Sequence, residues 1–137
     1  MSAKIVSRAM HTRVAIIGAG AGGHSLSSQL VRQGLLRSHE IAVFDPKTEH
    51  HYQPAYTMVG GGVIGNATQA KKKESYYVVR DQASMFMPGV NWVQQGVSAF
   101  DPENNSIILG NGTTCTYDYL IVSPGCELRW DLIPGAQ

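Results

Sequence analysis

The chain has 137 residues, a hydrophobic content of 43%, a charged content of 15% and a formal net charge of +1 at pH 7. This composition is typical of one globular domain with a core of its own and excludes a disordered chain. The near-neutral charge argues against a nucleic-acid partner, and no apolar run approaches the roughly 20 residues that span a bilayer.

The first twelve residues, 1–12, carry basic residues and no acidic ones. Lys4 and Arg8 lie here, and the first acidic residue of the chain is Glu40. Such a composition is typical of mitochondrial transit segments, but an ordinary flexible terminus explains this short stretch equally well. We therefore divide the chain into a flexible terminus or transit remnant, 1–12, and a domain, 13–137.

A strand, a glycine-rich turn and a helix are predicted at the start of the domain. Residues 13–17 form a short apolar run, partly β-branched, which predicts a buried parallel strand. A helix is predicted from residue 22 or 23 to about 33, with Leu26 and Leu30 on its core face and Gly34 at its end.

Between these two elements, Gly18, Gly20 and Gly23 have the spacing G-x-G-x-x-G. After a strand and before a helix, this spacing predicts a dinucleotide site. The first glycine allows the tight turn, the second lets the backbone approach a pyrophosphate, and the third lets helix and strand pack closely. The phosphates would rest on the N–H groups and the positive end of the helix.

Asp45 follows a second buried strand, predicted over 41–44, about 20 residues beyond the glycines. The dinucleotide fold places an acid there, because a carboxylate can accept hydrogen bonds from two ribose hydroxyls. Its negative charge would repel a 2′-phosphate. An Asp-Pro turn after a strand is the alternative interpretation, and the glycine motif in register favours the ribose role.

The rest of the chain completes a prediction of an α/β fold. We expect a Rossmann-type βαβ domain with a parallel sheet and an added β-hairpin or meander. Beyond Asp45 the predicted elements are a loop over 49–65, a helix over 74–87, a strand over 92–97, a hairpin of 106–109 with 113–117, and a buried strand over 120–122.

The stretch from Phe44 to Gly62 resembles a known family. An acid-Pro pair precedes the run His-His-Tyr-Gln-Pro at 50–54, and the run Tyr-Thr-Met-Val-Gly-Gly-Gly follows at 56–62. On these residues the chain resembles the N-terminal part of the mitochondrial kind of sulfide:quinone oxidoreductase, within the pyridine-nucleotide–disulfide oxidoreductase superfamily. The runs at 89–93 and 117–121 continue the resemblance.

The resemblance implies an incomplete two-dinucleotide-domain flavoprotein with FAD as its cofactor. Full enzymes of the family oxidise sulfide and pass electrons through FAD to a membrane quinone. The resemblance further implies a mitochondrial, inner-membrane-associated protein whose membrane contact lies in regions absent from this chain. The FAD-binding positions expected from the glycine motif and the resemblance are Gly18, Gly20, Ala21, Gly22, Gly23, Asp45, Gln53, Val97 and Gly125.

Several of these positions have specific expected roles. Gln53 matches a family FAD contact through its amide, and Val97 matches the residue whose backbone meets the adenine. Asp45 stands where the family usually has Glu, and its shorter side chain keeps the carboxylate acceptor but sets it further back. Ser-Pro-Gly at 123–125 replaces the usual Ala-Thr-Gly, and Pro124 removes one backbone N–H.

No catalytic residue and no metal site are expected in this chain. The resemblance places both redox cysteines beyond Gln137; we interpret Cys115 as structural and Cys126 as incidental. His50 and His51 are adjacent, so their side chains diverge. We expect the chain alone to be inactive. Another NAD(P)H- or quinone-linked FAD oxidoreductase of the superfamily, a non-catalytic FAD-binding fragment and an incomplete gene product are the alternatives.

Overall fold

The computed structural model describes residues 10–63 and 78–135. Six strands form one sheet, and two short strands form a separate ribbon. The elements in chain order are β1 (Met10–Ile17), α1 (Ala21–Arg32), η1 (Ser38–Glu40), β2 (Ile41–Phe44), β3 (Glu49–His51), α2 (Pro54–Gly60), β4 (Val79–Asp81), η2 (Gln82–Met85), β5 (Asn91–Val93), β6 (Val97–Asp101), η3 (Pro102–Asn104), β7 (Ser106–Leu109), β8 (Thr114–Val122) and η4 (Trp130–Leu132).

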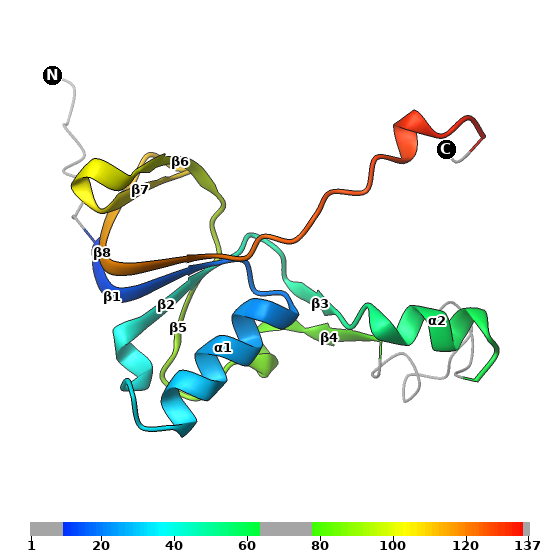
Figure 1. Ribbon diagram of the computed structural model, residues 1–137, viewed down its shortest axis with the longest axis horizontal. Coiled ribbons are helices and arrows are strands. Elements are labelled where there is room, and N and C mark those ends of the chain that lie inside the picture. The colour runs from blue at the N-terminus through cyan, green and yellow to red at the C-terminus, as the bar shows by residue number, and fades with distance from the viewer. Residues whose placement is uncertain (1–9, 64–77, 136–137) are drawn as a thin grey trace, which may run out of the picture.

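The main sheet is mixed and has the order β5-β2-β1-β8-β7-β6 (Figure 1). β5, β2, β1 and β8 are parallel neighbours, whereas β7 and β6 add an antiparallel meander. The register places Ile17 beside Phe44 on one side and Val122 on the other, so three strands end at one edge. The predicted α/β fold with a parallel sheet and an added meander is confirmed.

The sheet separates two apolar clusters. On the face that α1 covers, alternate residues of β1 and β2 form one cluster with Leu30 and Val31 of α1. On the other face the meander curls back over the sheet, and Ile107 and Leu109 of β7 pack against Phe44. Burial on both faces explains why the four residues of β2 are all apolar and all buried.

Helix α1 forms close to where it is predicted and ends before Gly34, which has a positive φ of 69°. Its buried face, however, differs from the expected one. Leu30 does pack on the sheet, but the fully buried positions are Gly23, His24 and Ser27 rather than Leu26. Gly23 and Ser27 are small, so the first turns of α1 can lie close to β1. The helix face that is buried against the sheet therefore contains these residues and not Leu26.

Two expected elements are wrong, and two expected strands have other bounds. The predicted loop over 49–65 contains β3 and α2, and the described part of the predicted helix over 74–87 is β4 and η2, its residues 74–77 lying outside the described ranges. The predicted strand over 92–97 is the end of β5 and the first residue of β6, and residues 120–122 are the end of β8. A strand of three residues is too short to show a hydrophobic periodicity in the sequence, and its pairing partner lies far away along the chain.

Two segments lie outside the sheet (Figure 1). One comprises β3, α2 and β4, and the other runs from the end of β8 through η4. Both expose large apolar side chains, and Leu128 and Leu132 of the second are more than 60% exposed. Within residues 10–63 and 78–135, no helix is long and apolar enough to cross a membrane.

Candidate dinucleotide site

The candidate site lies at the carboxyl edge of the parallel strands. The glycine loop follows β1, Asp45 follows β2, and the turn at 123–125 follows β8. Since β1 lies between β2 and β8, the chain leaves β1 toward one neighbour and returns on its other side. In open α/β sheets, ligands bind at such a switch point, outside the carboxyl ends of the strands.

The glycine loop is closely packed against the strand ends. Gly18 has a φ of 95°, a conformation that favours glycine, and its N–H donates to the Phe44 carbonyl at 2.9 Å. A Cβ on Gly18 would overlap the carbonyl oxygen of Ser123, and one on Gly23 would overlap the carbonyl oxygen of Gly18. The first and third glycines therefore have the turn and packing roles that their spacing predicts.

Gly20 differs from the other two, because a Cβ there would meet no atom within 4 Å. It is the N-cap of α1, offers no side-chain cap, and the first turn of the helix carries no acidic residue. The first N–H groups of a helix have no intrahelical partner, so the donors at Gly20, Ala21 and Gly22 stand at a helix start that carries no built-in anion. These features fit a pyrophosphate.

Asp45 lies directly beside the glycine loop. Its Oδ2 accepts a hydrogen bond from the Ala19 N–H at 2.8 Å, and its Oδ1 accepts one from the Lys47 N–H at 2.9 Å. The Trp92 indole N–H donates to the Asp45 carbonyl at 3.0 Å and anchors the strand end. Each carboxylate oxygen keeps a further lone pair, so the predicted ribose role is compatible with these bonds and stays a prediction.

The three remaining predicted positions lie on different elements. Gly125 follows Ser123 and Pro124, whose backbone packs against Gly18. Val97 is the first residue of β6, is half-buried and pairs with Leu109. The side chain of Gln53, at the N-terminus of α2, is exposed and makes no cap hydrogen bond. The FAD contacts of all three stay predictions.

A buried polar cluster beside the loop is absent from the sequence-based predictions. It joins His24 of α1, His50 of β3 and Gln82 of η2, which are 7%, 6% and 1% exposed. The His24 and His50 rings are 5.0 Å apart and nearly perpendicular, and His24 Nε2 lies 3.4 Å from Gln82 Oε1. Burial lowers the pKa of His24, the nearby His50 lowers it further, and the Gln82 hydrogen bond and Asp45 oppose this. The adjacent histidines at 50 and 51 were the available signal, because alternation in a strand buries one of them.

The two cysteines lie in different surroundings and do not pair with each other. Cys115 is buried in β8, and burial raises the pKa of its thiol, whereas Cys126 is exposed just after the turn at 123–125. In the described ranges, no group of three or more His, Cys, Asp or Glu residues is arranged to hold a metal ion. The site that the structure assembles is therefore one of backbone donors and a single carboxylate.

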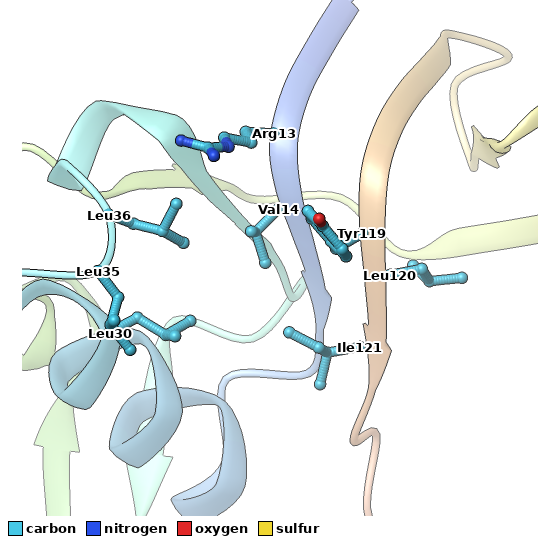
Figure 2. A pocket seen from close by; sticks show the side chains of 8 residues that line it. All are labelled: Arg13, Val14, Leu30, Leu35, Leu36, Tyr119, Leu120 and Ile121. Carbon is cyan, nitrogen blue, oxygen red and sulfur yellow. The ribbon is translucent and has the colours of Figure 1, made fainter.

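An apolar cavity of about 390 Å³ lies between the C-terminal end of α1 and β8 (Figure 2). Leu30, Leu35 and Leu36 line one side, and β1 and β8 line the other. Its one cation, Arg13, is already bonded to the Glu40 carboxylate at 2.9 Å. The cavity offers no set of N–H donors for phosphates, so we do not assign the nucleotide to it.

Comparison with known proteins identifies the chain's relatives. The family model of pyridine nucleotide-disulphide oxidoreductases matches residues 12–137. The mitochondrial sulfide:quinone oxidoreductase of Dictyostelium discoideum is 36% identical over 126 residues, which cover 92% of this chain and 26% of that protein. The enzyme of the same name from Mus musculus is 32% identical over 125 residues, or 91% of this chain and 25% of that protein.

Among solved structures, the sulfide:quinone oxidoreductase of Aquifex aeolicus has the same fold. It aligns with a TM-score of 0.60 and 19% sequence identity over 88% of this chain and 25% of that chain. The 137 residues thus span about a quarter of the length of the curated relatives that they match.

Proposed function

The chain belongs to the pyridine nucleotide-disulphide oxidoreductase family, and from this premise we propose that it is the FAD-binding part of a sulfide:quinone oxidoreductase. The family binds FAD. The observation that supports the proposal most directly is the uncapped start of α1, where Gly20 faces open space beside Asp45. The mitochondrial relatives supply the rest of the assignment.

In the proposed complex, this chain binds and orients the cofactor. The N–H groups at the start of α1 hold the pyrophosphate, and Asp45 accepts from the ribose of the adenosine half. The backbone at Val97 borders the adenine, while the Gln53 amide and the turn at Gly125 contact FAD further along. When bound, FAD supplies the electron-transfer chemistry that no side chain of the described residues can supply.

The activity of the whole enzyme is part of the same proposal. Its relatives' names imply sulfide as the electron donor, a quinone as the acceptor and the mitochondrion as the location. In this chain, Cys115 is buried in a strand and Cys126 is exposed, so the described residues hold no cysteine pair for reaction with sulfide. We therefore propose that the isolated 137-residue chain binds FAD without turning over sulfide.

The proposal is tested by titrating FAD into the purified chain and following flavin fluorescence. The sharpest variant is Gly20→Asp, because aspartate is a favourable N-cap that stabilises a helix yet repels a pyrophosphate. We expect the FAD affinity to fall about tenfold or more with an unchanged or higher Tm. The matched control is Gln33→Glu, which adds the same charge at the exposed C-cap of α1, the other end of the same helix.

Two results would contradict this function. One is a wild-type chain that binds no FAD, and the other is a Gly20→Asp variant that binds FAD as tightly as Gln33→Glu. A separate assay with sulfide and a soluble quinone addresses turnover. Quinone reduction by the isolated chain would refute the proposed inactivity while leaving FAD binding intact.

A further inference from the structure

The backbone of Ala19, in the middle of the glycine loop, is held on both sides of its Cα: the N–H belongs to the Gly18–Ala19 peptide and the carbonyl to the Ala19–Gly20 peptide. Its N–H donates to Asp45 Oδ2 at 2.8 Å, and its carbonyl oxygen lies 3.3 Å from His50 Nδ1. Ala19 is 1% exposed and His50 is 6% exposed, so the His50 bond is shielded from solvent, whereas the Asp45 bond is partly buried. The loop is thus tied to the end of β2 and to β3, two segments that pair with different strands.

The chemistry of the second bond defines the state of the histidine. A carbonyl oxygen can only accept, so His50 must carry a proton on Nδ1 and donate it. The ring is held in place by His24, whose ring lies edge-on at a centroid distance of 5.0 Å and an interplanar angle of 81°. Gln82 Oε1 accepts from His24 Nε2 in turn, so that His24 also has a defined tautomer.

The backbone orientation at Ala19 determines the direction of the N–H donors that follow it at the start of α1. The Gly18 N–H is held by the Phe44 carbonyl on one side, and the Gly20 carbonyl accepts from His24 in the first turn of α1 on the other, so Ala19 links the end of β1 to the helix. A rotation at Ala19 would redirect the N–H groups at the start of α1. Two external hydrogen bonds, one on each of the two peptide units that flank the Ala19 Cα, oppose such a rotation.

We infer that His50 is a positioning residue of the glycine loop: its Nδ1–H holds the Ala19 carbonyl, as Asp45 holds the Ala19 N–H, and together they aim the start of α1 at the pyrophosphate. The inference rests on the proposed dinucleotide site and adds to it a residue that touches the loop and not the cofactor. A purely packing role for a buried histidine is the alternative.

Two substitutions separate these roles. In His50→Asn, the side-chain amide nitrogen occupies nearly the position of Nδ1 and can still donate, whereas His50→Leu fills the space without a donor. If His50 only packs, leucine will serve at least as well as asparagine. If His50 positions the loop, asparagine will rescue what leucine loses. The matched control is His51→Leu, because His51 is exposed on the opposite side of the same strand.

The first readout is FAD affinity. Loss of one neutral hydrogen bond of typical strength predicts an FAD Kd about fivefold to tenfold higher for His50→Leu. We expect His50→Asn and His51→Leu to stay within about twofold of the wild type. Equal affinities of the leucine and asparagine variants at position 50 would overturn the inference.

The second readout needs no cofactor. Long-range proton–nitrogen NMR of the wild-type chain reports the tautomer of each histidine, and we expect a proton on Nδ1 of His50. Amide exchange at Ala19 should be faster in His50→Leu and close to wild type in His50→Asn. A proton on Nε2 alone would overturn the inference even if FAD binds, whereas absent FAD binding with the expected tautomer would defeat only the proposed function.

Discussion

Two regions of the molecule are built in opposite ways: the sheet body, which is the six-stranded sheet with α1, and the ribbon arm, which comprises β3, α2, β4 and η2. The body buries its strands on both faces, and every residue of β2 is buried. In α2 of the arm only Ala55 is buried, while Tyr56 and Met58 are more than 40% exposed. The body can stabilise itself, but the arm depends on where it joins the body.

That junction is polar. It consists of the His24–His50–Gln82 cluster, backed by Phe86. The bond from the Gln82 N–H to the Thr48 carbonyl at 2.8 Å extends the β3–β4 pairing up to this cluster. Since the same cluster contacts the glycine loop through His50, the arm and the candidate site share one support. Perturbing the body should therefore affect the whole fold, whereas perturbing the exposed part of the arm should not.

The largest effect is expected from Phe44→Ala. Phe44 is 1% exposed at the centre of the cluster under the meander, and removal of a buried phenylalanine side chain leaves a cavity. We expect the free energy of unfolding to fall by about 4 kcal/mol. Met58→Ala, which truncates an exposed side chain of α2, should change it by less than about 0.5 kcal/mol. Urea denaturation followed by circular dichroism measures both, and similar losses would remove the contrast between body and arm.

The same contrast explains what could be predicted from the sequence. The strand over 41–44 and the strand–glycine–helix unit before it could be predicted from the sequence. A strand that is buried on both faces is a continuous apolar run, and turn residues mark its ends. β3 and β4 could not be predicted, because each is only three residues long and pairs with the other across a long sequence separation, with His50 opposite Arg80. The Asp45 position followed from spacing, but its bond to the Ala19 N–H depends on side-chain geometry that spacing does not contain.

A second comparison uses glycines, one from each region. In the body, a Cβ on Gly23 would overlap the Gly18 carbonyl oxygen, so Gly23→Ala must push α1 away from the loop. We expect a loss of about 2 to 3 kcal/mol of unfolding free energy, as for overpacking of a tight core. In the arm, a Cβ on Gly60 would meet nothing within 4 Å, and Gly60→Ala should add up to about 1 kcal/mol through helix propensity.

Thermal denaturation of Gly23→Ala and Gly60→Ala shows directly which of the two substitutions lowers the stability. A lower Tm for Gly23→Ala and an equal or higher Tm for Gly60→Ala are expected. If both variants had the wild-type Tm, the close approach of α1 to the loop would not contribute to stability.

The smallest expected effect is a pH dependence that arises at the junction itself. Burial lowers the pKa of His24 below its ordinary value of 6.5, and His50 adds to this, while the Gln82 hydrogen bond and Asp45 oppose it. The unfolded chain therefore binds a proton at a higher pH than the folded chain does. The stability linked to neutral His24 is complete above pH 6.5 and is lost as the pH falls below it.

His24→Gln retains a donor for Gln82 without a titrating ring, and His51→Gln removes an exposed histidine of the arm as the control. Urea unfolding at a series of pH values from 7.5 to 5 should show a shallower decline for His24→Gln than for the wild type or His51→Gln. Parallel curves for all three proteins would mean that proton uptake at the junction does not weaken the connection between arm and body.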